Sequence, residues 1–468
     1  MLMRFFCVVA LCLTADTLMP AQAVPAAGDL QRVMERLDRL EKQNQELQSE
    51  VQELRRQLAG QQAGSSSAEA ATPGEPNSPA APTPAERLDV QESRTAELAQ
   101  SKMGTSQRMP VELTGMLLFN AFHNGGFGGG LQMPITAQLT ESATSTGASF
   151  RQTVIGLKFN GPELPGGGKA SGSAYFDFWG GSSIPSNNLF RIRLATLDLA
   201  WKNTTITAGQ DKPIIAPREP TSFAQVGFAP LTGAGNLWDW QPQVRIEQRF
   251  TLRHGLTPED SETGMRVQAG VFETAEVAPA GAPGSIANTL ERQRPAYEAR
   301  VLFFSGNDRK RLEIAPGFHL STTHIAGQSV ASQLGTLDWL VKPNSRMMVS
   351  GAMFRGINAA GLGSLRQGFT ILPNGSVVAV HATGIWSQLS VFATSRVTLN
   401  IFGGQESDRA ADLATNSVRR NLVYTGNIMY KFASNVIAAM EFSQTRTGYV
   451  AAGTRLNNHY DLALAYLF

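Results

Sequence analysis

Few residues in this chain of 468 have side chains that could perform covalent or metal chemistry. The only two cysteines, Cys7 and Cys12, lie in the first apolar stretch, so the chain beyond it offers no thiolate for a disulfide, a metal site or a nucleophile. His319 and His324 are five positions apart, and no third ligand lies near them in the sequence. The sequence therefore predicts no metal site and no cofactor.

Motifs for phosphate binding or hydrolysis are also missing. The stretch GPELPGGGKA (161–170) is rich in glycine, but Ala170 follows Lys169 where a phosphate loop needs Ser or Thr, so we predict a tight turn. A hydrolase needs a base beside a nucleophile, and no nucleophile motif accompanies the scattered histidines. These are His254, His381 and His459. We predict that the protein is not an enzyme, and its formal net charge of only +2 gives no indication of nucleic-acid binding.

The side chains best able to act on a solute are charged residues that alternate with apolar ones. In QVRIEQRFTLR (243–253) the two kinds fall on opposite parities, which a strand projects to opposite faces. A charge facing lipid near the midplane costs about 2–4 kcal/mol, so these charges are expected to face a water-filled interior. The predicted pore-lining residues are Lys158, Asp177, Arg245, Glu247, Arg249, Arg253, Glu298 and Arg300.

One stretch, RIRLATLDLAW (191–201), breaks this alternation. Its parity places Arg191 and Arg193 on the same face as Leu197, Leu199 and Trp201. Either a β-bulge between the two groups or a position of the arginines at the rim would restore the order. The sequence leaves both possibilities open.

Strands must position these side chains, because the region from 110 to 468 follows a period of two with glycine-rich turns. The clearest case is NNHYDLALAYLF (457–468), in which aromatic residues and leucines alternate with His, Asp and Ala. We predict an all-β transmembrane antiparallel barrel of about sixteen strands. Their ranges are 110–122, 150–160, 170–179, 190–201, 204–210, 242–253, 264–273, 296–304, 311–321, 333–341, 346–356, 383–393, 396–404, 421–431, 435–445 and 456–468.

The predicted connections alternate between long and short. Long ones follow the strands that end near 122, 210, 273 and 356, whereas others are as short as KNT, KPNS or ASN. Outer-membrane barrels have long loops outside and short turns in the periplasm, an asymmetry that a soluble sandwich does not need. An even strand count also places both ends of the barrel on the periplasmic side.

The N-terminal region predicts export and self-association. Arg4, the apolar stretch FFCVVALCL and the Ala21-Gln22-Ala23 site predict a signal peptide over 1–23. Residues 28–59 carry heptads, as in EKQNQELQSEVQEL (41–54), and predict a short periplasmic coiled coil whose register is fixed by Asn44 at an a position. Residues 60–109 are rich in Pro, Ala and Ser and predict a flexible linker with a short helix within it.

This order of segments, the terminal Phe468 and the long loop after the fifth strand resemble Gram-negative trimeric porins, most of all the DcaP-like porins. The resemblance implies a homotrimer in the outer membrane that admits small hydrophilic solutes. It also implies that loop 211–241 folds into the bore, opposite a basic wall of Arg245, Arg249 and Arg253. The constriction residues so implied are Lys212, Arg218, Glu219 and Asp239. The acidic PEFGG-like tip of general porins is absent, and PREPTSFAQVGF stands there instead.

The charge balance adds a weak indication of selectivity. From residue 111 onward there are 29 Lys and Arg against 24 Asp and Glu, which favours a mild preference for anions such as carboxylates. The predicted function is therefore passive diffusion through an outer-membrane channel. Two alternatives stay open: a phospholipase-like barrel enzyme, and an adhesin whose coiled coil is the working part.

Overall fold

The computed structural model describes residues 111–181, 188–253, 261–273, 290–291, 295–325, 328–365 and 367–468. The predicted signal peptide (1–23), coiled coil (28–59) with Asn44, and linker (60–109) lie outside the described residues. In the part of the chain that is described, no helix is long and apolar enough to cross a membrane.

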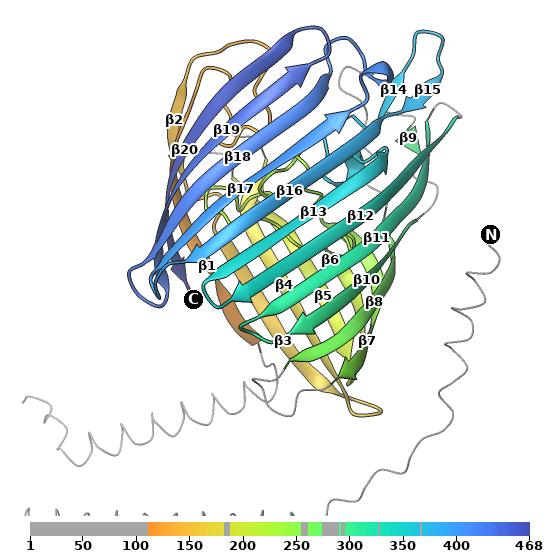
Figure 1. The fold of residues 1–468 in the computed structure, drawn as a ribbon, viewed down its shortest axis with the longest axis vertical. Coiled ribbons are helices and arrows are strands. Elements are labelled where there is room, and N and C mark those ends of the chain that lie inside the picture. Colours follow the sequence, from red (N-terminus) through yellow and green to blue (C-terminus); the bar gives the residue numbers. More distant parts are fainter. Residues whose placement is uncertain are drawn as a thin grey trace, which may run out of the picture. The chain divides into compact units, whose positions relative to one another are not determined.

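Sixteen antiparallel strands form a closed barrel, which confirms the predicted all-β antiparallel barrel (Figure 1). Closure is made by β1 and β20, which pair from Met116 opposite Leu467 to Asn124 opposite His459. Every predicted strand overlaps one of the sixteen. They are β1 (Val111–Asn124), β3 (Val154–Leu164), β4 (Gly168–Gly180), β5 (Leu189–Ala200), β6 (Thr204–Asp211), β7 (Gln241–Arg253), β8 (Glu262–Phe272), β10 (Ala296–Gly306), β11 (Arg311–Ile325), β12 (Gln328–Asn344), β13 (Met347–Ile357), β16 (His381–Phe392), β17 (Val397–Asp408), β18 (Val418–Lys431), β19 (Val436–Tyr449) and β20 (Gly453–Leu467).

Several short elements lie at the rim that carries the long connections. They are β2 (Ser145–Ser149), β9 (Leu290–Glu291), the hairpin of β14 (Phe369–Ile371) and β15 (Val377–Ala379), and the 3-10 turns η2 (Ala360–Leu362) and η3 (Ala410–Asp412). The opposite rim carries tight turns such as 201–203, 345–346 and 432–435, so the predicted asymmetry holds. Both barrel ends lie at this short-turn rim, where the Phe468 amide donates to the Gly115 carbonyl over 3.1 Å.

Side chains alternate between the two faces of the wall as the sequence predicts. On β10, Tyr297 is 52% exposed on the outer face, whereas Glu298 and Arg300 are 2% and 3% exposed on the inner face. From Tyr460 onward the outward residues of the C-terminal segment are large and apolar, and Asp461, Ala463 and Ala465 between them are buried. The outward set is Tyr460, Leu462, Leu464, Tyr466 and Phe468. The barrel therefore has an apolar outside and a polar inside.

The irregular stretch of β5 contains a bulge. Tyr175 of β4 pairs with Leu194, but the next residue, Phe176, pairs with Ile192, so Arg193 is the extra residue. The bulge reverses the parity after Arg193, so Arg191 and Arg193 both face inward while Leu197 faces outward, as Ile192 does. The first of the two possibilities left by the sequence is thus the one that the chain adopts.

Candidate functional site inside the barrel

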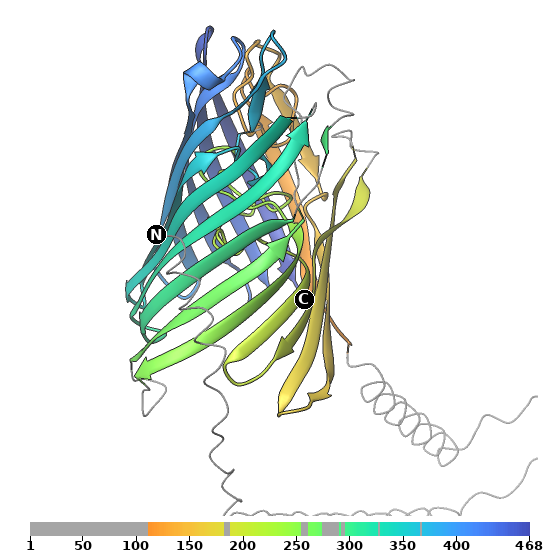
Figure 2. The same ribbon diagram turned by 90° about the vertical axis from the view of Figure 1, so that its right-hand side faces the viewer.

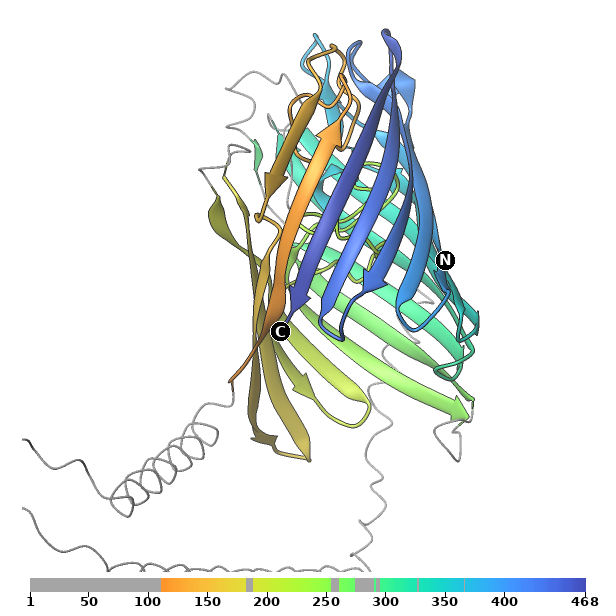
Figure 3. The ribbon, with the colours of Figure 1, turned by 90° about the vertical axis from the view of Figure 1, so that its left-hand side faces the viewer.

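The connection from β6 to β7, residues 212–240 and here called the inner loop, lies inside the barrel (Figures 2 and 3). Its apolar residues pack on the wall instead of facing solvent. Ile215, which is 1% exposed, belongs to one buried cluster with Leu334 and Phe354 of the facing strands. The resemblance placed a loop over 211–241 within the bore, and the structure has a loop in that place.

One end of the inner loop is tied to β11 and β12 by charge. The Arg218 guanidinium donates to Asp338 over 2.9 Å and also pairs with Glu313. Asp338 is shared with Arg300, whose Nε donates to it over 2.7 Å. Charge-assisted bonds of this kind are stronger than neutral ones and fix geometry. Arg218 is therefore a structural anchor of the loop as well as a charge in the bore.

The middle of the inner loop is held by hydrogen bonds to one carboxylate, Glu441, and to two glutamine side chains, Gln388 and Gln152. The Ser222 hydroxyl donates to Glu441 of β19 over 2.6 Å, and the Thr221 amide donates to Gln388 of β16 over 2.6 Å. Gln152 accepts the amides of Val226 and Gly227 over 2.6 and 2.7 Å. Gln388 lies two strands from Asp338 and Glu441 five, whereas Gln152 precedes β3 on the opposite side of the barrel, so the loop spans the interior.

The inner loop also approaches the wall backbone closely at two glycines. Gly235 has a φ of +97°, and a side chain there would meet the backbone of Ile385 on β16. A Cβ on Gly404 of β17 would lie 2.2 Å from the Ala234 carbonyl oxygen. Neither position has room for a larger residue.

The substitution Gly404→Val is expected to displace the inner loop from β16 and β17, because the added carbons need the space that the Ala234 carbonyl occupies. We expect single-channel conductance to rise and to fluctuate more than in the parent protein. Gly426→Val is the matched control, since a Cβ on Gly426 meets nothing within 4 Å. Identical recordings from both variants would show that this contact does not position the loop.

The predicted pore-lining charges are mostly neutralised in pairs. Arg245 pairs with Asp211 at 2.6 Å, Arg249 with Glu262 at 2.5 Å, and Glu247 with Arg266 at 3.0 Å. The other predicted residues pair as follows: Asp177 with Arg191 and Arg193, Glu298 with His319, Arg300 with Asp338, and Lys158 with Glu112 at 3.9 Å near the short-turn rim. Arg253 is exposed at the end of β7. Because these charges are paired, the net charge of the bore is smaller than the count of Lys and Arg in the sequence indicates.

The predicted constriction residues do not converge on one point. Lys212 and Glu219 pair with each other at 2.9 Å, whereas Arg218 is bound to the wall. Asp239 lies beside the wide mouth of the barrel. These residues are brought onto one loop but into three different environments.

Sequence reasoning missed the wall residues that receive the inner loop. Asp338, Glu313, Glu441 and Gln388 each contact it, and all lie on the inward parity of their strands. Parity alone could have marked them as inward. Their contacts with the inner loop could not be predicted from the sequence, because that loop is distant from them in the chain.

A chain of three side chains on β10 and β11 was also missed. His319 lies 2.9 Å from a Glu298 oxygen and 3.3 Å from the Ser321 hydroxyl. The residue types are those of a hydrolase. However, His319 is 4% exposed, and the Ile215 amide of the inner loop contacts the second Glu298 oxygen at 3.4 Å. We read this chain as a buried support for the inner loop.

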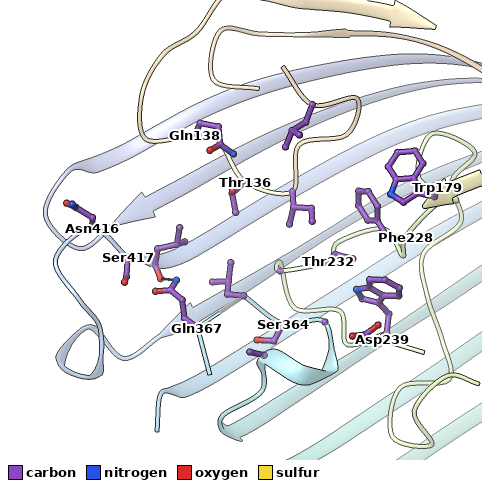
Figure 4. Close-up of a pocket in the computed structure, with 18 of the residues that line it drawn as sticks. Thr136, Gln138, Trp179, Phe228, Thr232, Asp239, Ser364, Gln367, Asn416 and Ser417 are labelled. Carbon is purple, nitrogen blue, oxygen red and sulfur yellow. Dashed lines mark hydrogen bonds between the residues drawn. The ribbon is translucent and has the colours of Figure 1, made fainter. Parts of the chain in front are cut away.

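Above the inner loop, a cavity of about 920 Å³ opens between the loops of the long-loop rim (Figure 4). Aromatic side chains, Trp179 and Phe228, form one side of it, and their rings lie 5.7 Å apart. Neutral polar residues form much of the rest: Thr136, Gln138, Thr232, Ser364, Gln367, Asn416 and Ser417. A small polar molecule in this cavity would meet hydrogen-bonding groups and flat apolar faces, some of them on the inner loop.

Residues 358–365 form the floor of this cavity together with the inner loop. The Trp238 amide donates to the Leu362 carbonyl over 2.9 Å, and the Gln241 side chain donates to the Gly361 carbonyl over 2.7 Å. The Leu365 amide in turn donates to buried Glu406 over 3.0 Å. Two loops thus brace each other across the barrel. In the described residues, no group of three His, Cys, Asp or Glu side chains could hold a metal ion.

No model of a known protein family matches this sequence, and no curated protein sequence matches it. Solved structures do match. The outer membrane channel DcaP of Acinetobacter baumannii has a TM-score of 0.63 and 14% identity, covering 76% of this chain and 97% of that one. OmpF of Salmonella typhi, solved with daunomycin, has a TM-score of 0.50 and 11% identity, with 76% and 97% covered. At these identities the likeness shows a shared barrel fold.

Proposed function

We propose that this chain forms a channel in the bacterial outer membrane through which small hydrophilic solutes diffuse passively. The observation that carries the proposal is a closed barrel of sixteen strands whose outer face is apolar and whose interior is polar. In such a wall the backbone groups of every strand pair with neighbouring strands, apolar side chains contact lipid, and charged side chains face the interior. The shared fold with the DcaP channel supports the same function.

The proposed arrangement is a homotrimer with its long loops outside the cell. Both barrel ends lie at the short-turn rim, so a chain segment that precedes Val111 starts in the periplasm. From the sequence we further propose a cleaved signal peptide over 1–23, a coiled coil over 28–59 in the periplasm, and a linker over 60–109. The surrounding partners are outer-membrane lipid and other copies of the chain.

Swelling of liposomes tests passive diffusion directly. Vesicles that contain the purified protein are expected to swell in sugars of small size and progressively less in larger ones, because the inner loop narrows the bore. Swelling that does not depend on solute size, or none at all in the smallest sugars, would contradict a size-limited channel.

We further propose a mild preference for anions such as carboxylates. The excess of Lys and Arg in the barrel region supports it, and the ion pairs within the bore limit it. Arg245, Arg249 and Arg253 form the basic stretch of β7.

Reversing these three arginines, as R245E/R249E/R253E, is expected to shift ion preference toward cations, because each change adds negative charge to the bore. The measurement is the reversal potential in a salt gradient. R346E/R396E is the control, since these exposed arginines lie in short turns outside the bore. Equal shifts in both variants would place the selective charges elsewhere.

A further inference from the structure

The outer face of β18, β19 and β20 carries a polar row near the long-loop rim. Arg446 donates to the Tyr424 hydroxyl and to the Gln444 side chain, both over 2.9 Å. Gln444 then donates to Asn458 over 2.8 Å. Tyr424 and Gln444 are register partners, as are Gln444 and Asn458, so the row runs straight across three strands.

A second arginine extends the row onto β17, where Arg420 of β18 donates to Gln405 over 2.5 Å. Both arginines are exposed, and neither has an ion pair in the described part of the chain. The carboxylates of β17–β20 all face inward instead. Glu406, Asp408, Glu441 and Asp461 are 0%, 7%, 3% and 3% exposed. The outer face of these strands is therefore positive and has no counter-ion of its own.

An apolar groove of about 770 Å³ lies directly beside this row on the same outer face. The lining residues nearest to the row are Gly426, two positions after Tyr424 on β18, and Phe442, two positions before Gln444 on β19. A Cβ on Gly426 would meet nothing within 4 Å, so the missing side chain leaves a hollow there. The other walls include Ile401, Ile428, Met440 and Leu462.

Among the described residues at the long-loop end of β4 and β5, no arginine faces outward. At the long-loop end of β4 and β5, the outer face is aromatic, with the Phe176 and Phe190 rings stacked at 4.7 Å. Ile192 is also exposed on that face. A polar row is thus not a general feature of the wall at this height.

We propose that the outer face of β17–β20 binds a phosphorylated lipid of the outer leaflet. Its phosphate would lie on Arg420, Arg446 and the Tyr424 hydroxyl, and an acyl chain would occupy the groove past Gly426. Guanidinium groups bind phosphate in a bidentate manner, and burial of acyl carbons adds an apolar contribution. β17–β20 carry no carboxylate that points outward, so the phosphate would supply the negative charge that this face lacks. The inference rests on the proposed outer-membrane location.

The test measures lipid retention by the purified full-length protein with native mass spectrometry in detergent. The probes are bis-phosphorylated lipid A, the same lipid without phosphates, and inorganic phosphate. We expect R420Q/R446Q to bind lipid A at least about tenfold more weakly, because both cations that would contact the phosphate are removed. Gly426→Trp, which fills the hollow, should also weaken retention. The control R396Q/K431Q removes two cations from the other rim of the same strands.

The pattern of lipid retention either supports or contradicts the proposed lipid site. Loss of lipid A in R420Q/R446Q but not in R396Q/K431Q supports the site, as does failure of the dephosphorylated lipid to bind. Equal binding by both variants would overturn it, as would binding of inorganic phosphate as tight as that of lipid A, or cross-linking of this face to a second copy. A channel that conducts but retains no lipid A refutes this inference alone, whereas lipid binding without conductance refutes the proposed function.

Discussion

Shortening the inner loop is expected to raise single-channel conductance severalfold. Replacing residues 217–228 with Gly-Ser-Gly would remove the segment that crosses the barrel from the Asp338 side to the Glu441 side. The apolar start of the loop, which includes Ile214 and Ile215, would stay packed on the wall. Because ion flow is limited by the narrowest cross-section, removal of the crossing segment opens the path. Planar-bilayer recordings give the conductance step.

The matched control removes residues 372–376, the exposed tip of the β14–β15 hairpin on the same rim. That tip lies outside the interior, so conductance should stay at the parent value. If the inner-loop variant conducted like the control, the limiting cross-section would lie away from this loop. Size exclusion in liposome swelling should relax in parallel with the conductance change.

The second large effect is expected from Asp177→Ala. Asp177 is fully buried and is the only carboxylate that pairs with Arg191 and Arg193 among the described residues, at 2.7 and 2.9 Å. Removing one member of a buried ion pair costs about 3–5 kcal/mol, because the remaining charge loses its counter-ion. Here, within the part of the chain that is described, the two arginines would keep only the Val226 and Gly227 carbonyls as acceptors. Both arginines also lie over the Trp240 ring, with centroid distances of 5.1 and 4.5 Å, so their release should loosen the end of the inner loop.

The measurement for Asp177→Ala is urea unfolding of the protein in lipid vesicles, followed by tryptophan fluorescence. Asp177→Asn should lose part of the stability, since an amide oxygen still accepts hydrogen bonds. Asp198→Ala is the control, because Asp198 accepts from the Thr207 and Thr196 hydroxyls and pairs with no arginine. A midpoint for Asp177→Ala equal to that of Asp198→Ala would contradict a central role of the ion cluster.

Most of the barrel could be predicted because the wall repeats one rule. Each strand needs apolar side chains on its lipid side and polar ones on its water side. This alternation, as at Tyr297 and Glu298, can be read from neighbouring residues in the sequence. Even the exception at 191–201 was visible as a break in parity. Its resolution by a bulge at Arg193 needed the register with β4, which is a long-range property.

The interior was harder to predict, because its contacts join residues far apart in the sequence. The predicted charges of β7 do face inward, yet their partners, such as Asp211 and Glu262, decide how much net charge remains. Arg218 was identified as a residue of the bore, and its bond to Asp338 shows that it also anchors the loop. A count of Lys and Arg cannot show which charges are paired.

The most direct test of the central claim is single-channel recording of the purified protein in a planar bilayer. The account predicts stepwise, ohmic conductance increments, grouped in threes if the proposed trimer forms, together with a small reversal potential in a salt gradient that favours anions. Absence of conductance at any voltage, from protein shown to be folded in the same bilayer, would contradict a diffusion channel.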